Sequence, residues 1–314
     1  MEKIFIGMPV YNGERFIEQA IASIIDQTHT NWVLCISDNH STDATSAICK
    51  AWVAKDKRIN YRQQEENIGV AANFLFLLTA ASAEYFMWAA ADDTWDKHFI
   101  EACLPPLIST HDISLSFCNI RNINSFGAAM RMYPSFGRFV NTDKAGQIAS
   151  FILDPEYLGK ANLIYGIYKL SLCRKTMIDS LNRGMDMWGA DITFVLNIIL
   201  LPYNIHIDER VLFNKRIAAP ADKINKPRKI QPEFSHINGI PLTENHYQPY
   251  FSFMRQSTSQ SPYFGLVDSL VDYRQSLTID IIGYKMKWGK LPLPFIFFLQ
   301  LRKLLARKKD SKIR

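Results

Sequence analysis

Strand-like and helix-like segments alternate along the first half of the chain. Between the strand-like runs lie segments with apolar residues at helical spacing, such as GERFIEQAIASIIDQT and GVAANFLFLLTAAS. Strands that are apolar on both faces and alternate with helices are typical of a mostly parallel sheet covered on both sides. The pattern therefore predicts an α/β domain. The strand-like runs are, in chain order, KIFIGMPV, WVLCISD, RINYRQQ, EYFMWAAA and ISLSFCNI.

The second half of the chain is less regular. SFGAAMRMYPSFGRF (125–139) combines Gly, Pro and aromatic residues and predicts a long loop, whereas ANLIYGIYKLSLC predicts a further strand. GADITFVLNIILLP predicts a helix with Asp191 at its start. From Pro220 to Ser261 there is little periodicity, which predicts a loop-rich region that caps the site. We expect one domain over residues 1–215 and a C-terminal extension over residues 216–314.

One predicted helix contains an internal breaker. The segment DKHFIEACLPPLIST has helical spacing but carries Pro105 and Pro106 near its end. Proline lacks the N–H that a helix interior needs, so we expect the helix to break there.

The positive charge of the chain is concentrated at its C-terminus. The formal net charge is +6, and residues 284–314 hold ten Lys or Arg against one acid. The rest of the chain is slightly acidic, which argues against a nucleic-acid-binding body. LPLPFIFFLQLRKLLARKKDSKIR predicts an amphipathic helix on an anionic membrane surface. A C-terminal helix docked on the body, with a solvated basic end, is the alternative.

Cysteine usage and hydropathy indicate where the protein works. The five cysteines form no CxxC pair and lie among apolar residues, which favours reduced thiols over a zinc site. MEKIFIGMPV lacks the pattern of a signal peptide, and no apolar stretch reaches the ~18 residues of a spanning helix. We expect a cytoplasmic protein, peripheral at the inner face of the cell membrane through its tail.

Polar residues cluster where the predicted strands end, in PVYNGE, SDNHSTD and AADD. In open α/β sheets, ligands bind beyond these carboxyl ends. The chain has neither GxxxxGK[ST] nor GxGxxG after its first strand, which argues against a P-loop protein and a dinucleotide-binding dehydrogenase. A nucleotide bound without such a loop would need a metal ion to neutralise its phosphates.

Two adjacent carboxylates, Asp92 and Asp93, close the fourth predicted strand. They are hard oxygen ligands suited to Mg²⁺ or Mn²⁺, which use one or two protein carboxylates together with substrate phosphates. Neighbouring side chains of an extended chain point in opposite directions, so only one of the two would face the metal. The alternative is that the pair caps the helix that follows near Asp96.

Three stretches together carry a resemblance to a known family: MPVYNGERFIEQAIASIIDQTHTNWVLCISDNHSTDAT, ENIGVAANF and YFMWAAADDTW. Their succession resembles the family-2 glycosyltransferases with the GT-A fold. Members show a strand ending in Pro-x-Tyr-Asn and a second strand ending in Asp before Ser-Thr-Asp-x-Thr. An Asn-x-Gly segment and an Asp-rich metal motif follow. The resemblance covers residues 3–125 closely and reaches more loosely to about residue 215.

The resemblance implies roles in donor binding for the first two strand ends. Pro9, Tyr11 and Glu14 match the loop that lines the nucleoside pocket in the family. Asp38 matches a carboxylate that contacts the nucleobase, where a fixed acceptor can take an N–H from uracil. The alternative for Asp38 is a turn cap.

Further roles follow for the segments after the third and fourth strands. Asn67 and Gly69 match the segment that crosses beneath the donor. By the same resemblance Asp93 is the metal residue, and Asp92 faces the donor ribose or sugar. The family often reads Asp-Asp-Asp or Asp-x-Asp here, whereas this chain has Ala91-Asp92-Asp93. Loss of the first acid would weaken metal affinity without abolishing it.

Transfer of the sugar requires a base. The family inverts the anomeric carbon, and a carboxylate on the opposite face of the sugar takes the proton of the attacking hydroxyl. In MDMWGADITFVLN, Asp191 matches this general base, with Asp186 as the second candidate. The alternative is that Asp191 only caps its helix.

The resemblance implies a metal-dependent inverting glycosyltransferase that uses Mg²⁺ or Mn²⁺. Its donor would be a nucleotide sugar, most simply a UDP-sugar, and its acceptor a glycan or lipid-linked saccharide in bacterial cell-surface polysaccharide assembly. Two other classes stay open. A nucleotidyltransferase would also use paired acids, although PVYNGER lacks its glycine-rich basic loop. A catalytically silent nucleotide-binding protein would keep the fold without turnover.

Overall fold

The computed structural model describes residues 1–140, 143–181, 189–217, 236–237, 240–241 and 244–288. The strands are β1 (Ile4–Val10), β2 (Trp32–Asp38), β3 (Ile59–Gln63), β4 (Tyr85–Trp88), β5 (Thr94–Trp95), β6 (Ile113–Ile123), β7 (Ala129–Met132), β8 (Ile167–Lys169), β9 (Asn204–Arg216), β10 (His236–Ile237) and β11 (Ile240–Pro241). The α-helices are α1 (Ile17–Ile25), α2 (Thr45–Lys55), α3 (Val70–Ala80), α4 (Phe99–Ser109), α5 (Lys144–Leu153), α6 (Leu170–Leu181), α7 (Ala190–Ile199), α8 (Glu244–Thr258) and α9 (Phe264–Trp288). Short 3-10 helices are η1 (Phe136–Phe139), η2 (Glu156–Leu158) and η3 (Lys160–Tyr165).

The strands of the body form one twisted sheet in the order β3-β2-β1-β4-β8-β6-β9-β5, with β7 paired to β6. The pairs β1–β2, β2–β3, β1–β4 and β6–β9 are parallel. β8 lies between β4 and β6 and runs antiparallel to both. The predicted mostly parallel sheet is confirmed, and the carboxyl ends of β1, β2 and β4 meet at the same edge.

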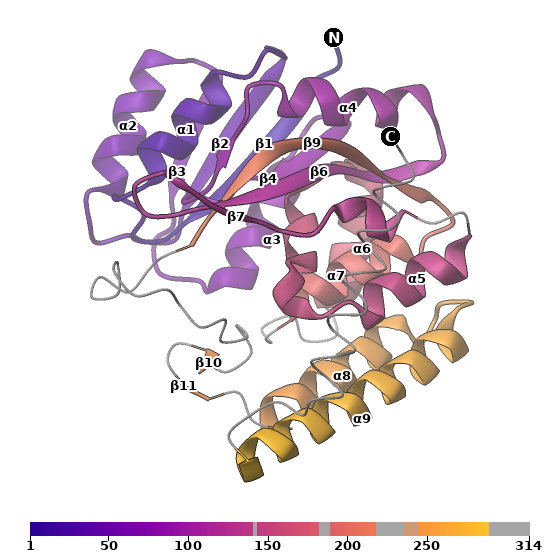
Figure 1. The fold of residues 1–314 in the computed structure, drawn as a ribbon. Helices are drawn as coiled ribbons and strands as arrows, with labels where there is room; N and C mark the ends of the chain where they lie inside the picture. The colour runs from indigo at the N-terminus through magenta and orange to yellow at the C-terminus, as the bar shows by residue number, and fades with distance from the viewer. Residues whose placement is uncertain (141–142, 182–188, 218–235, 238–239, 242–243, 289–314) are drawn as a thin grey trace.

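Helices cover both faces of the sheet (Figure 1). α1, α2 and α4 lie on one side, and α3, α6 and α7 on the other. Between the sheet and the second group, Trp88 packs its ring edge-on against Phe86, Tyr168 and Phe194, with ring centroids 4.7, 6.2 and 5.6 Å away. All four rings are fully buried. This aromatic core explains why the apolar run ahead of Asp92 and Asp93 is so long.

Two local predictions were wrong because tertiary contacts outweigh local signals. α4 continues through Pro105 and Pro106 to Ser109, since Cys103, Leu104 and Leu107 are buried against the sheet. In the predicted strand ANLIYGIYKLSLC, only Ile167–Lys169 is extended, between η3 and α6.

The predicted loops also contain regular structure. The segment 125–139 includes β7, which pairs with β6, and the helix η1. The region predicted as loop-rich from Pro220 to Ser261 includes the helix α8, which buries Tyr250, Phe251, Phe253 and Met254. Most of the remaining predicted capping region lies outside the described residues.

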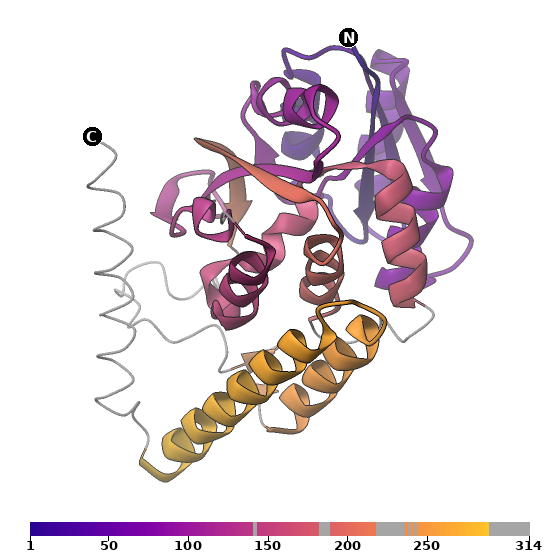
Figure 2. The same ribbon diagram turned by 90° about the vertical axis from the view of Figure 1, so that its right-hand side faces the viewer.

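α8 and α9 form an antiparallel hairpin beneath the body (Figure 2). α8 contacts α7, and α9 contacts α5. At this junction Arg274 donates to Glu156 Oε2 at 2.6 Å, and Lys160 Nζ lies 3.4 Å from Glu156 Oε1. The side chains of Lys160, Glu156 and Arg274 are at most 9% exposed. A buried ionic network therefore ties the hairpin to the body.

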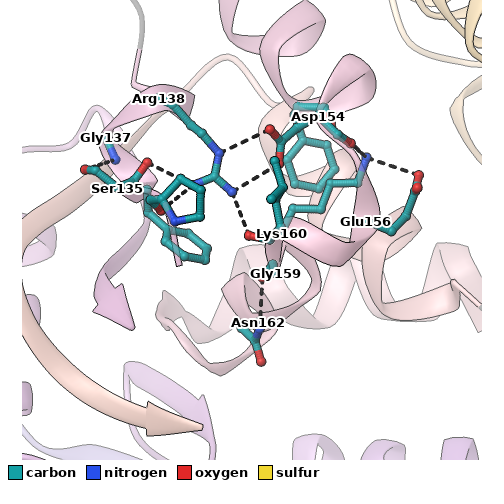
Figure 3. A network of polar contacts seen from close by, with 12 residues as sticks. Ser135, Gly137, Arg138, Asp154, Glu156, Gly159, Lys160 and Asn162 are labelled. Atoms are coloured by element: carbon teal, nitrogen blue, oxygen red, sulfur yellow. Dashed lines mark hydrogen bonds and ion pairs between the residues drawn. The ribbon is translucent and has the colours of Figure 1, made fainter. Parts of the chain in front are cut away.

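The network extends to η1 through Asp154 (Figure 3). Lys160 donates to the backbone oxygens of Phe151 and Asp154, at 2.9 and 2.7 Å. The Arg138 guanidinium binds both carboxylate oxygens of Asp154 at 3.2 and 3.0 Å. Burial acts to raise the pKa of Glu156, but Arg274 and Lys160 together outweigh it, so that pKa lies below its usual value. Glu156 therefore stays charged at neutral pH, and this contribution to stability is lost only when the pH falls through its lowered pKa.

The C-terminal predictions fall mostly beyond the described part of the chain. Almost all of the predicted basic amphipathic tail falls within residues 289–314, which lie outside the described residues. Among the helices that are described, none combines the length and the apolar character needed to cross a bilayer. The predicted boundary near residue 215 falls at the end of β9, the last strand of the sheet.

Candidate active site

The predicted first loop, Tyr11 to Glu14, lies over the start of α2. Gly13 donates its N–H to Thr45 Oγ1 at 2.8 Å, and Glu14 Oε2 accepts from Ala44 N at 2.8 Å. Glu14 therefore satisfies a backbone donor at the start of a helix. Tyr11, in contrast, is 52% exposed and is available to stack on a bound ring. Pro9 lies in β1, where its Cα is paired with Ser37 of β2.

Asp38 is fully buried at the end of β2. Its Oδ1 accepts from Ser41 N at 2.8 Å, and its Oδ2 accepts from the Tyr61 hydroxyl at 2.6 Å. Both oxygens are thus engaged inside the protein, which matches the turn-cap alternative. Each oxygen can accept a second hydrogen bond, but Asp38 is 0% exposed, so a contact with a nucleobase would require the residues that cover it to move.

Asn67 and Gly69 lie together at the start of α3, next to the loop after β2. Asn67 Oδ1 accepts from Gly69 N at 3.0 Å and from Asn39 Nδ2 at 2.9 Å. Asn39 Oδ1 in turn accepts from Ile68 N at 2.9 Å. Gly69 has a φ of 84°, a conformation that a side chain would strain. The buried Asn39 therefore holds the predicted donor-binding segment against the end of β2.

Asp92 and Asp93 differ sharply in environment. Asp92 is exposed, whereas Asp93 is 0% exposed. Asp93 Oδ2 accepts from Lys215 Nζ at 2.9 Å, and its Oδ1 accepts from Arg216 N at 2.7 Å. Burial raises the pKa of Asp93 to about 6, although Lys215 opposes this shift. The pair does not cap α4, whose N-cap is His98.

Lys215 and Arg216, which bind this acid pair, were not found by sequence reasoning. They come from the end of β9, which pairs with β5 so that Asn214 faces Thr94. Burial acts to lower the pKa of Lys215, but neighbouring Tyr165, Asp93 and Asp92 outweigh it and raise this pKa, so the ammonium stays charged. A signal was present, since IHIDERVLFNKR is rich in β-branched and aromatic residues and ends in two cations.

Arg216 fixes this end of β9 in place. Its Nε donates to the backbone oxygen of Asp92 at 2.7 Å, and its two terminal nitrogens donate to Asn124 O and Gln19 Oε1 at 3.0 and 2.7 Å. The guanidinium also lies over the ring of Phe16, 4.4 Å from its centroid. The acid loop is therefore held rigidly against α1 and β9.

Asp191 lies in the first turn of α7 and interacts electrostatically with Lys215. Burial raises its pKa, while the backbone N–H of Ile192 and the charge of Lys215 act to lower it. Burial raises the pKa of Tyr165 to about 12, with Lys215 opposing and Asp93, Asp92 and Asp191 adding to the rise. These three acids thus share one electrostatic neighbourhood around Lys215 and Tyr165. Asp186, the second candidate base, lies outside the described residues.

Gly189 positions Asp191. Its φ is 83°, and a Cβ atom there would lie 2.4 Å from the ring of Tyr250 on α8. Gly189→Ala is therefore expected to cost roughly 1–3 kcal/mol of unfolding free energy and to displace the start of α7. Urea unfolding and turnover measure the two effects. Gly265→Ala is the control, because a Cβ atom there meets nothing within 4 Å. Equal stability of both variants would contradict the view that the positive φ of Gly189 and its close approach to Tyr250 require a glycine.

The residues around Asp93 do not fit the predicted divalent cation as they stand. Both oxygens of Asp93 are already hydrogen-bonded, one of them to an ammonium. A cation on Asp93 would have to share a fully buried oxygen with the Lys215 ammonium or with the N–H of Arg216. Across the described residues there is no group of three or more His, Cys, Asp or Glu side chains that could hold a metal ion.

Comparison with known proteins identifies the family that this chain resembles over its first half. Residues 5–159 match the family described as Glycosyl transferase family 2. This region is a family-2 glycosyltransferase domain. The enzyme WfgD of Escherichia coli, named UDP-Glc:alpha-D-GlcNAc-diphosphoundecaprenol beta-1,3-glucosyltransferase, is 30% identical over 122 residues, which are 39% of this chain and 47% of WfgD. The matched regions span between 15% and 50% of the length of the curated relatives.

Solved structures confirm the predicted GT-A fold of the family-2 domain. S. aureus TarS 1-349 in complex with UDP-GlcNAc aligns with a TM-score of 0.61 at 15% identity, over 91% of this chain and 76% of that one. Mannosyltransferase PcManGT from Pyrobaculum calidifontis, in complex with GDP-Man and Mn²⁺, aligns with a TM-score of 0.53 at 13% identity, over 99% of this chain and 84% of that one. Divalent cations are common in this fold, as the second structure illustrates.

Proposed function

We propose that this protein is an inverting glycosyltransferase. It would move a sugar from a nucleotide donor, most simply a UDP-sugar, to a hydroxyl of a glycan or lipid-linked saccharide in cell-surface polysaccharide assembly. The observation that carries the proposal is the shared electrostatic neighbourhood of Asp191 on α7 with Asp92 and Asp93 after β4. A base close to a donor-binding acid pair is what such a transfer needs.

The chemistry can be written with this chain's own residues. The acceptor oxygen attacks the anomeric carbon as the bond from that carbon to the diphosphate breaks. The nucleoside diphosphate leaves with the electron pair, and Asp191 takes the hydroxyl proton. Burial raises the pKa of Asp191, which makes the carboxylate a better proton acceptor. Tyr11, exposed beside the end of β1, would line the nucleoside pocket with Pro9, Asn67 and Gly69.

Two comparisons support the donor and the acceptor. WfgD is named for transfer from UDP-Glc to a diphosphoundecaprenol-linked sugar, and TarS holds UDP-GlcNAc in a similar fold. The proposal does not include the metal dependence predicted from the sequence, because the Lys215 ammonium binds Asp93, the predicted metal residue, at 2.9 Å. The predicted association of the tail with an anionic membrane stays a prediction.

The test is turnover of a panel of UDP-, GDP- and dTDP-sugars with mixed saccharide acceptors. Release of nucleoside diphosphate is measured by chromatography, and the anomeric configuration of the product by NMR. Inversion at that carbon is expected. A nucleotidyltransferase would instead release pyrophosphate from a nucleoside triphosphate. Nucleotide binding without turnover of any sugar would favour the silent binding protein.

A further inference from the structure

We propose that Lys215, anchored on Asp93, supplies the positive charge that holds the donor's diphosphate, so that donor binding needs no divalent cation. The inference rests on the proposed function. It concerns how the diphosphate is neutralised, a task that the sequence assigned to Mg²⁺ or Mn²⁺ at Asp93.

The first argument is the position of the charge. Lys215 Nζ lies 2.9 Å from Asp93 Oδ2, on the acid that the family resemblance makes the metal residue. The other oxygen of Asp93 is held by the backbone N–H of Arg216 at 2.7 Å. The ammonium therefore binds one carboxylate oxygen of the residue predicted to hold the metal, and a backbone N–H binds the other.

The second argument is that the ammonium can still bind an anion. An ammonium carries three N–H donors. Among the described residues, Asp93 is the one hydrogen-bond acceptor that the structure gives Lys215. The side chain of Lys215 is 24% exposed while that of Asp93 is 0% exposed, so solvent reaches Lys215 but not Asp93. Phosphate oxygens arriving from solvent would therefore contact Lys215 and not Asp93.

The third argument is rigidity. Arg216, the next residue, is tied to the backbone of Asp92 and Asn124 and to the side chain of Gln19. The Tyr165 ring lies under Lys215, 5.4 Å from Nζ to the ring centroid. A charge held in place before the ligand arrives loses little conformational entropy on binding. Lys215 is thus preorganised, as a bound metal ion would be.

The test uses isothermal titration of the full chain with UDP, GDP and dTDP, each in EDTA and in MnCl₂. For the nucleotide that binds, the wild-type dissociation constants in EDTA and MnCl₂ are expected to agree within roughly threefold. Lys215→Met is expected to weaken binding in EDTA by roughly 10- to 100-fold, the usual effect of losing a hydrogen bond to a charged group. Lys215→Arg keeps the charge and is expected to retain binding.

Controls separate this effect from a loss of folding. Lys57→Met removes an exposed lysine of the turn between α2 and β3 and is expected to bind as the wild type does. Because Lys215→Met leaves Asp93 buried without its partner, Asp93→Asn is combined with it in a double variant, which should weaken binding to the same extent. Thermal unfolding of each variant is measured first.

The outcomes are distinct. The proposal is overturned if MnCl₂ strengthens wild-type binding by more than about threefold, or if Lys215→Met and the double variant lose less than about tenfold in EDTA. Binding that requires MnCl₂ would leave the proposed function standing and assign the diphosphate to a metal. If none of the three nucleotides binds in either condition, both proposals fail.

Discussion

Asp191→Asn is expected to lower the turnover number by about 10²- to 10⁴-fold, the usual contribution of a positioned general base. Asparagine has nearly the same shape but cannot take a proton. Nucleotide affinity is expected to change little, because Asp191 acts on the acceptor hydroxyl. Steady-state kinetics with the active sugar donor measure the first effect, and titration with the nucleoside diphosphate measures the second.

The same substitution decides between a base and a helix cap. Asp191 Oδ1 accepts from Ile192 N at 2.8 Å, a role that an asparagine oxygen can fill. If Asp191 only stabilises the start of α7, the variant will keep near-normal turnover. Asp143→Asn is the matched control, because Asp143 is the N-cap of α5 and its Oδ1 accepts from Gly146 N. It is expected to leave turnover unchanged.

Lys160→Met is expected to lower the free energy of unfolding by about 1–3 kcal/mol, because it removes the donor to two buried backbone oxygens and leaves Glu156 paired with Arg274 alone. Lys160 is fully buried. It forms an ion pair with Glu156 and donates hydrogen bonds to the backbone oxygens of Phe151 and Asp154. Methionine fills similar space but offers no donor. Urea unfolding followed by circular dichroism measures the change.

Two further variants test the origin of that loss. Lys50→Met removes an exposed lysine of α2 and is expected to stay within about 0.5 kcal/mol of the wild type. Glu156→Gln combined with Lys160→Met is expected to cost less than the sum of the single changes, since the two side chains are in direct contact and Glu156→Gln alone leaves the Lys160 ammonium without this carboxylate. A loss below about 1 kcal/mol for Lys160→Met would show that the network is not a source of stability.

Much of the fold could be predicted because its signals are local. The apolar runs that became β1, β2, β4 and β6, and the helical spacing of α1 and α7, each depend on residues close in the chain. The strand-end acids could be found for the same reason, since each directly follows an apolar run. The errors lie where distant packing overrides local preference. α4 passes through two prolines, and α8 forms in a stretch without periodicity.

The amino-acid sequence by itself determined the alternating α/β architecture, the acids at the strand ends and the family resemblance, because hydrophobic period and turn chemistry are written in neighbouring residues. Only the tertiary structure decided which oxygens those acids leave available. The Tyr61 hydroxyl donates to Asp38 Oδ2. Lys215, 122 positions after Asp93 in the chain, donates to Asp93 Oδ2. The availability of a carboxylate is set by the partners that folding brings to it, and no pattern of neighbouring residues specifies them.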